Sequence, residues 1–218
     1  TAERHILPYS APGNADGWHL ISSPLGTTSI SGNTSLEPGA GDDFYAYSET
    51  TAQWLNWKVG ANNITTMGAG QGYLVAYELA ATKTFTGTPN HASVPFSNLS
   101  VSPAQGQGWH LLGNPFQSAI IWNDHADWNI VNIGGVAKVM SNTGSFTDVL
   151  EEGIIPAMQG FWVQAVNETN SITIPLAART HDATTAWNKS TPSGHILLAA
   201  KDLESGMEQE SRIRFNPG

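Results

Sequence analysis

Apolar and polar residues alternate over short stretches of this chain, and no stretch keeps a helical period for more than about two turns. Short segments rich in aromatic and β-branched residues are bounded by Gly, Pro, Asn and Ser, as strands are. We predict strands over Trp18–Ser22, Phe44–Tyr47, Trp54–Val59, Tyr73–Tyr77, Val136–Met140, Ser145–Leu150 and Phe161–Val166. The pattern predicts an all-β fold, built as an antiparallel β-sandwich or an open barrel.

An internal repeat organises these strands. Gly17–Pro24 (GWHLISSP) returns as Gly108–Pro115 (GWHLLGNP), Gln71–Ala76 (QGYLVA) returns as Gln159–Gln164 (QGFWVQ), and Lys83–Thr86 loosely matches Asn170–Thr173. The matches keep their order at nearly one spacing, which indicates two related halves. We assign residues 1–103 to the first half and residues 104–190 to the second.

Residues 191–218 break the repeat. His195–Lys201 is an apolar strand, Asp202–Glu210 is acidic and typical of a loop, and Ser211–Phe215 is a second strand. The expected hairpin either closes the sheet of the second half or begins a further domain that is cut off at Gly218.

Composition excludes several classes of protein. With 40% hydrophobic residues and 8 Trp the chain is too apolar for a disordered protein. Only 9 Lys and Arg stand against 18 Asp and Glu, so no basic surface could follow a nucleic acid backbone. There is no Cys for a disulfide or a thiol nucleophile, and no apolar run is long enough to span a membrane. The charged fraction, 12%, is about half of the usual one, as in many secreted β-proteins.

Motifs for catalysis are missing from the sequence. It contains no Gly-rich phosphate loop, no zinc-protease motif, no serine-hydrolase elbow and no EF-hand loop. A glycosidase would need two carboxylates about 5–10 Å apart across a cleft. The acidic pairs Asp42–Asp43 and Glu151–Glu152 lie in turn-like settings, and nothing in the sequence selects either of them. We therefore expect that the chain is not an enzyme.

Seven short motifs together resemble a known kind of module. The motifs are Gly17–Pro24, Asp43–Glu49, Gly70–Val75, Phe85–Thr88, Gly108–Phe116, Ile155–Phe161 and Ala178–His181. Their order resembles that in the duplicated β-rich module of long secreted Bacteroidetes proteins. In those proteins the module stands shortly before a type IX secretion sorting domain. The resemblance covers about residues 9–182 and departs from the family at Asn114–Gln117. It implies a secreted or cell-surface location, reads the segment Ile196–Phe215 as the start of the following domain, and assigns no activity.

Tryptophan and tyrosine are the candidate ligand-binding residues, because their rings stack on the apolar faces of sugars while tolerating partial exposure. Trp18 and Trp109 occupy matching places in the two halves, so we expect them, with Tyr73 and Phe161, to be scaffold. Trp54, Trp57, Trp122, Trp128 and Trp187 have no aromatic residue at the matching place. We predict that a groove or patch formed by at least one of Trp54, Trp57, Trp122 and Trp128, lined also by Tyr45 and Tyr47 and flanked by Asp or Asn, binds a glycan. The alternative is that these rings fill the space between two sheets.

Two further sites are weighed in the same way. Asp124 and Asp127, with Asn123 and His125 beside them, offer oxygen ligands for Ca²⁺, although a short acidic segment is more often a solvated turn. Apart from that calcium site, no cofactor is expected. His19 and His110 alternate with the repeated tryptophans, and we expect both to face solvent.

Together these observations favour a non-catalytic extracellular β-module, a glycan-binding accessory domain of a secreted or surface multidomain protein. Its expected partners are a polysaccharide or glycan and the neighbouring domains of the same chain, with no nucleic acid and no membrane span. A structural spacer or adhesin module without a small ligand is the alternative. A polysaccharide-degrading enzyme is a third possibility, for which no acid/base pair can be defined.

Overall fold

The computed structural model describes residues 1–9, 17–141, 143–181, 195–201 and 208–214, the last two ranges by their backbone alone. The chain divides into two compact units, Thr1–Asn188 and Lys189–Gly218. In the second unit β18 (His195–Lys201) and β19 (Glu208–Arg214) form an antiparallel hairpin. The predicted hairpin is therefore present, with a second strand that begins earlier than expected.

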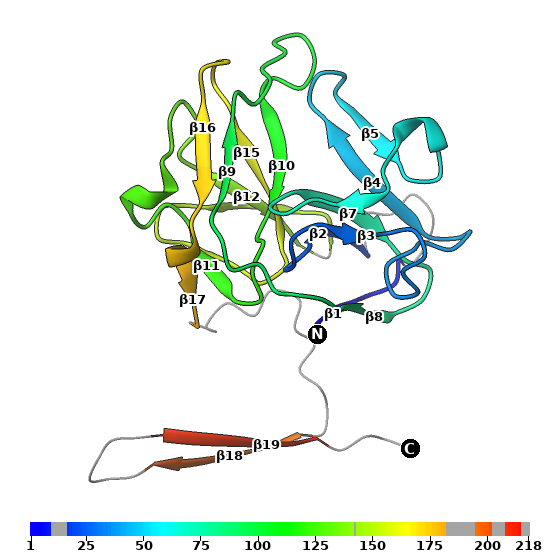
Figure 1. Ribbon diagram of the computed structural model, residues 1–218, viewed down its shortest axis with the longest axis vertical. Helices are drawn as coiled ribbons and strands as arrows, with labels where there is room; N and C mark the ends of the chain where they lie inside the picture. Colours follow the sequence, from blue (N-terminus) through cyan, green and yellow to red (C-terminus); the bar gives the residue numbers. More distant parts are fainter. Residues whose placement is uncertain (10–16, 142, 182–194, 202–207, 215–218) are drawn as a thin grey trace. The chain divides into compact units, whose positions relative to one another are not determined.

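Eight strands build the first part of the larger unit: β1 (Ala2–Ile6), β2 (Trp18–Ser22), β3 (Thr28–Ser29), β4 (Asp43–Ser48), β5 (Gln53–Asn56), β6 (Thr66–Met67), β7 (Gly72–Ala76) and β8 (Ala81–Phe85). They pair as one four-stranded sheet in the order β2-β7-β4-β5 and two ribbons, β1-β8 and β3-β6. All of these pairs are antiparallel (Figure 1).

The next strands are β9 (Val94–Ser97), β10 (Trp109–Gly113), β11 (Ala119–Ile121), β12 (Ala137–Met140), β13 (Phe146–Val149), β14 (Ile154–Ile155), β15 (Gly160–Gln164), β16 (Ser171–Ile174) and β17 (Arg179–Thr180). Their sheets run in the order β10-β15-β12-β13, β16-β9 and β14-β11-β17. Each pairing among β1 to β8 thus recurs eight strands later, with β17 added. The only helical segments among the described residues are three short 3₁₀ turns, Gly60–Asn62, Ala126–Trp128 and Leu176–Ala178.

The all-β, antiparallel class expected from the sequence is confirmed. The recurrence of pairings begins at β9, however. In the second set of strands β9 has the place that β1 has in the first set. Val94, Phe96, Leu99 and Val101 pack against the core of the second set, although they precede residue 104. The packing boundary therefore lies earlier in the chain than the boundary read from the repeated motifs.

Each four-stranded sheet covers one apolar core. The first core contains, among others, Ile6, Ile21, Leu36, Phe44, Tyr73, Val75 and Phe85, and the second contains Leu112, Phe116, Ile120, Trp122, Trp128, Phe161 and Val163. Successive side chains of a strand point to opposite faces, so the residues between these core residues lie on the other face of each sheet. There a third, smaller cluster of Leu20, Leu111 and Met140 joins the two sheets.

His19 is buried and His110 is half-buried, which corrects our expectation that both face solvent. His19 Nε2 lies 3.2 Å from the carbonyl oxygen of Leu7; in the equivalent strand His110 Nε2 lies 2.8 Å from that of Ser100. Burial, helped by the nearby Arg4 charge, lowers the pKa of His19 to about 4, so its ring is neutral at pH 7. Both histidines tie the segment before their strand to the sheet, while Trp18 and Trp109 lie on the opposite face.

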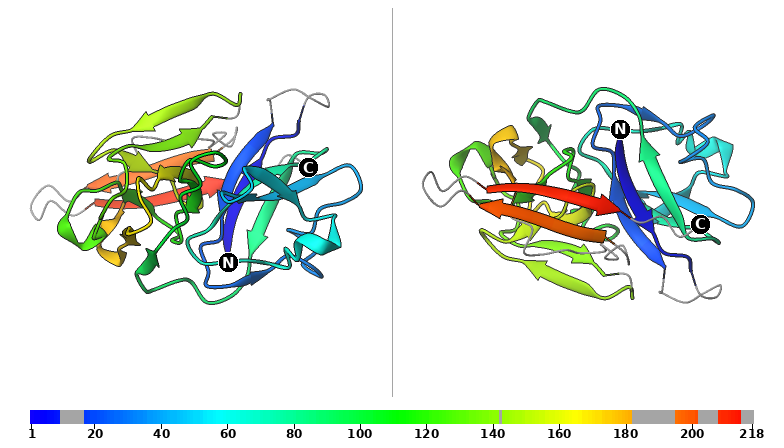
Figure 2. Two further views of the ribbon diagram at one scale, coloured as in Figure 1. Left: turned by 90° about the horizontal axis from the view of Figure 1, so that it is seen from above. Right: turned by 90° about the horizontal axis from the view of Figure 1, so that it is seen from below.

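The two sheets meet through backbone that approaches at glycine positions. Gly113 N–H donates to the carbonyl of Gly70 at 2.8 Å, and the equivalent Ser22 N–H donates to that of Met158 at 3.0 Å. A Cβ at Gly72 would overlap the carbonyl oxygen of Leu112. Figure 2 shows the blue-to-cyan strands and the green-to-yellow strands as neighbouring groups. We call this contact the sheet junction.

Glu49 fastens the chain that leads from one sheet to the other. Its buried carboxylate, at the end of the β4–β5 hairpin, accepts hydrogen bonds from Ser102 N–H (2.6 Å), Ser102 Oγ (3.0 Å) and Gly108 N–H (2.9 Å). Burial raises the pKa of Glu49, but hydrogen bonds from Ser100, Ser102 and Gly108 outweigh it and lower the pKa to about 2. The carboxylate is therefore ionised in the folded protein at all ordinary pH values.

Replacing Gly72 by alanine tests the sheet junction. The added methyl group has no room beside Leu112, so we expect the free energy of unfolding to fall by about 1–3 kcal/mol, the usual cost of overpacking. Gly60→Ala is the matched control, since nothing lies within 4 Å of the added Cβ there. Urea unfolding of both variants measures the effect, and equal stability of the two would contradict the tight contact.

Replacing Glu49 by glutamine tests its role as an anchor. The variant loses charge-assisted hydrogen bonds to buried groups, and we expect about 1–3 kcal/mol less stability at pH 7. Because the folded-state pKa is below the unfolded one, the native carboxylate stabilises the fold above about pH 4.5 and loses this effect as the pH falls toward 2. As the pH is lowered from 7 to 2, the thermal unfolding temperature should therefore fall more steeply for the native protein than for Glu49→Gln. Parallel pH profiles of the two unfolding temperatures would contradict this role.

Candidate functional site

Five aromatic side chains meet on the face of the sheets opposite the cores. Strand alternation directs Tyr45 and Tyr47 of β4 away from the buried Phe44, and the register places Trp54 of β5 directly opposite Tyr47. Trp18 comes from β2, and Trp162 comes from β15 of the second sheet. We call Trp18, Tyr45, Tyr47, Trp54 and Trp162 the aromatic patch.

The rings of the aromatic patch form a continuous chain of contacts. The ring centroids of Tyr47 lie 5.3 Å from Trp54 and 4.8 Å from Trp162, and those of Trp54 and Trp162 lie 5.6 Å apart. These three rings are inclined to one another by 65–80°. Tyr45 extends the chain, 6.5 Å from Trp54 and 5.9 Å from Trp18. Edge-to-face contacts of this kind hold aromatic rings in defined positions.

The aromatic patch is open to solvent on one side and supported on the other. Trp54 is 38% exposed and the other four rings are partly buried. Trp18, Tyr47 and Trp162 pack against the buried cluster that joins the two sheets. The patch is thus a surface feature whose ring positions are set by packing beneath it.

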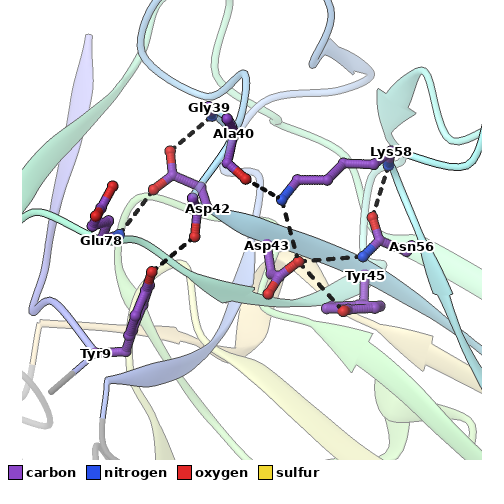
Figure 3. Close-up of polar contacts among 10 residues, drawn as sticks. Tyr9, Gly39, Ala40, Asp42, Asp43, Tyr45, Asn56, Lys58 and Glu78 are labelled. Carbon is purple, nitrogen blue, oxygen red and sulfur yellow. Dashed lines mark hydrogen bonds and ion pairs between the residues drawn. The ribbon is translucent and has the colours of Figure 1, made fainter. Parts of the chain in front are cut away.

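A polar rim borders the aromatic patch at Tyr45 (Figure 3). The Asp43 carboxylate accepts hydrogen bonds from Asn56 Nδ2 (3.3 Å) and Tyr45 OH (3.4 Å), and the Lys58 ammonium lies 3.6 Å from it. Lys58 also donates to the carbonyl of Ala40 at 2.8 Å. Asp43 and Lys58 each keep about a third of their side chain exposed, so the rim offers a carboxylate, an amide and an ammonium to solvent.

Both tyrosines of the aromatic patch stay uncharged over the neutral range. Burial, together with the charge of Asp43, raises the pKa of Tyr45 in spite of a hydrogen bond from Asn56. Burial and the Glu49 charge raise the pKa of Tyr47. The patch therefore presents neutral rings and phenolic hydroxyls at any pH near 7.

Asp42, next to the rim, holds a loop in place through hydrogen bonds to its carboxylate. Its carboxylate accepts hydrogen bonds from the N–H groups of Gly39 and Glu78, both at 2.8 Å, while Tyr9 OH donates to the Gly41 carbonyl at 3.0 Å (Figure 3). These contacts hold the loop before β4 against the end of β7. The acidic pair Asp42–Asp43 thus divides into one residue that shapes a loop and one that faces the rim.

The structure brings together Tyr45, Tyr47 and Trp54 from the predicted set, but not the rest of it. Trp57 packs against the first core. Trp122 and Trp128 are 0% exposed, so our expectation that they line a ligand site is wrong. Their rings contact each other with centroids 4.8 Å apart, and Trp122 also contacts Phe161. Trp187 lies outside the described residues.

The predicted calcium ligands Asp124 and Asp127 face different surroundings. Asp124 accepts a hydrogen bond from the indole N–H of Trp128 at 3.1 Å, which satisfies that buried donor. Asp127 is exposed at the edge of an open groove of about 770 Å³ that Arg179 also lines. Within the part of the chain that the structure describes, no three His, Asp or Glu side chains gather as a metal site would require.

Sequence reasoning missed two members of the aromatic patch. Trp18 was expected to be scaffold, and Trp162 was not singled out. The signal was present in the alternation of β15, where the core residue Phe161 places its neighbour Trp162 on the other face. The equivalent residue of the first half is Leu74. It pairs with Leu20 in the first sheet, as Trp162 pairs with Leu111 in the second sheet.

The same registers identify the residues that replace the aromatic patch in the second sheet. In the first sheet Tyr45 pairs with Asn56, and at the same place in the second sheet Lys138 pairs with Asp148. Likewise, the pair Tyr47 and Trp54 of the first sheet corresponds to the pair Met140 and Phe146 of the second. Trp54 therefore does have an aromatic counterpart, Phe146, contrary to our expectation. The equivalent set is Trp109, Lys138, Met140, Phe146 and Leu74. Its Lys138 forms an ion pair with Asp148, which takes the place of Asn56.

Replacing the buried and exposed tryptophans separately tests these assignments. We expect Trp122→Ala to lower the free energy of unfolding by about 3–5 kcal/mol, because it empties the centre of the second core. Trp54→Ala should cost about 1 kcal/mol, since only ring contacts at the surface are lost. Denaturant unfolding compares the two, and a larger loss for Trp54→Ala would contradict the assignment.

Comparison with protein-family models, curated proteins and solved structures finds no match to this chain. Among its described residues there is no helix of the length and hydrophobicity that crossing a membrane requires.

Proposed function

We propose that the protein is a non-catalytic glycan-binding module and that the aromatic patch is its binding surface. The observation that carries the proposal is the exposed ring of Trp54, held by Tyr47 and Trp162 and bordered by Asp43 and Asn56. A sugar ring has an apolar C–H face and a rim of hydroxyls. An indole ring matches the face, and carboxylate and amide groups match the hydroxyls.

The packing beneath the aromatic patch supports a binding surface rather than a chance exposure of apolar groups. Exposed rings that are already fixed lose little conformational freedom on binding, which favours affinity. Tyr47 and Trp162 rest on buried residues of both sheets, and Trp54 contacts both of these rings, so the ring positions do not depend on a ligand.

The carboxylates near the aromatic patch support binding without catalysis. Glu49 is buried and its pKa is lowered to about 2, which is unsuited to donating a proton at neutral pH. Asp43 is bound to Lys58, Asn56 and Tyr45. Glu49 therefore does not offer the raised-pKa acid that glycoside hydrolysis uses, and the Asp43 carboxylate is held by its three partners.

The setting we propose is a secreted or surface protein with several domains. Its support is the resemblance of the ordered motifs to the modules of secreted Bacteroidetes proteins, together with the separate hairpin unit Lys189–Gly218. In that setting the described strands would hold a glycan while neighbouring domains of the same chain carry other activities. The recurrent strand pairing further suggests that the module arose by duplication of one eight-stranded unit.

A structural spacer without a ligand is the second candidate. The observation that favours it is the sheet junction, where backbone hydrogen bonds join the two sheets. In addition, the Arg4 guanidinium donates hydrogen bonds to the Met158 carbonyl and to Gln159 Oε1. A spacer needs such rigidity and needs no exposed aromatic surface.

Tryptophan fluorescence during titration with a panel of neutral and charged polysaccharides tests the proposal. We expect a change in intensity or a blue shift with at least one of them, since Trp54 and Trp162 would lose contact with water. Trp54→Ala and Trp162→Ala should weaken binding at least tenfold, corresponding to about 1.4 kcal/mol or more.

Phe146→Ala is the matched control for these variants. Phe146 is exposed and takes the place of Trp54 in the second sheet, but it lies outside the aromatic patch. Binding by this variant should equal that of the native protein. Flat titrations across the whole panel would refute the glycan proposal and leave the spacer in its place.

A further inference from the structure

We infer that the ligand of the aromatic patch is a single, uncharged polysaccharide chain, bound at one site per protein. This inference rests on the proposed function and deepens it by naming the class of glycan. Four features of the described residues carry it: the inclination of the rings, the charges around them, the exposed indole of Trp54, and the difference between the two sheets.

The inclination of the rings excludes a flat ligand surface. Tyr47, Trp54 and Trp162 stand at 65°, 78° and 80° to one another, so they form a corner rather than a plane. A crystalline polysaccharide presents a flat face that needs coplanar rings to cover it. A single chain can instead stack one sugar on Trp54 while the neighbouring rings contact its edges. Soluble oligosaccharides should therefore bind, and crystalline material should not.

The charges around the aromatic patch disfavour an anionic chain. The positive charge of Lys58 is matched by Asp43, and that of Lys138, which lies beside Trp162 in the sheet, is matched by Asp148. Glu49 adds a buried negative charge close enough to Tyr47 to raise its pKa. No cation in this surrounding, among the described residues, is left without a nearby carboxylate. The chain as a whole carries a net charge of −9, which also repels polyanions.

The apolar face of the ligand follows from the exposed indole. Stacking on Trp54 requires a sugar face made of C–H groups, as in hexoses whose hydroxyls are mostly equatorial. The hydroxyls at the edge of that sugar then point toward Asp43 and Asn56, which can accept and donate hydrogen bonds. Neutral β-linked glucans combine these properties.

The difference between the two sheets leaves one such site among the described residues. At the places of Tyr45, Tyr47 and Trp162 the equivalent set has Lys138, Met140 and Leu74. Met140 is buried and Lys138 is engaged with Asp148, so Phe146 stands without neighbouring stacked rings. Repetition of the strands therefore does not repeat the binding surface.

Calorimetry and fluorescence with defined probes test the inference. We expect the native protein to bind cellohexaose and a soluble β-glucan with one site per chain. Polygalacturonate and dextran sulfate should bind at least tenfold more weakly, and crystalline cellulose should retain no protein. Asp43→Asn leaves the Lys58 charge unmatched, so its affinity for polygalacturonate should rise several-fold and the rise should vanish at high salt.

The outcomes separate this inference from the proposed function. If polygalacturonate binds as tightly as the β-glucan and Trp54→Ala abolishes both, the aromatic patch binds glycans but the inference of an uncharged ligand is wrong. Two sites per chain, or binding lost in Phe146→Ala, would overturn the single site. Retention on crystalline cellulose would overturn the corner geometry. If no probe and no polysaccharide of the panel binds, both the inference and the proposed function fail.

Discussion

The close contact of two backbone segments at the sheet junction is the constraint on which the rest of the structure depends. Glycines at positions 72 and 113 let strands of the two sheets approach until backbone groups of one sheet hydrogen-bond to backbone groups of the other. Gly113 N–H donates to the Gly70 carbonyl, and Ser22 N–H donates to the Met158 carbonyl. Any side chain there would hold the sheets apart. Because the sheets lie this close, Trp162 of one reaches Tyr47 and Trp54 of the other.

The junction also explains how one strand can serve two cores. In a strand, alternate side chains leave on opposite faces, so Phe44 enters the first core while Tyr45 and Tyr47 face the side where the sheets meet. Near the junction that second face is covered and apolar. Toward β5, at the edge of the sheet, it becomes open, and there the same alternation exposes Trp54. The same alternation thus gives a covered face near the junction and an exposed aromatic face at the edge of the sheet.

Polar residues around this surface divide into those that hold the chain and those that remain available. Glu49 and Asp42 have their carboxylates occupied by backbone N–H groups and shape the segments beside the aromatic patch. Asp43, Asn56 and Lys58 bind mainly one another and keep part of their surface in water. Sequence alone does not distinguish Asp42 from Asp43, because the two differ only in what the folded loop places opposite them.

By itself the sequence determined the all-β class, the repeated motifs and the strands of the two four-stranded sheets, because alternation and Gly or Pro boundaries are local properties of the chain. It did not predict the short strands that pair as ribbons, such as β3 and β6. It also selected Tyr45, Tyr47 and Trp54 correctly as neighbours, since one hairpin joins them. Only the tertiary structure decided that Trp122 and Trp128 fill a core, that His19 points inward, and that Trp162 joins the aromatic patch. The physical reason is that alternation tells which side chains share a face, whereas only the packing of one sheet on another decides whether that face meets protein or water.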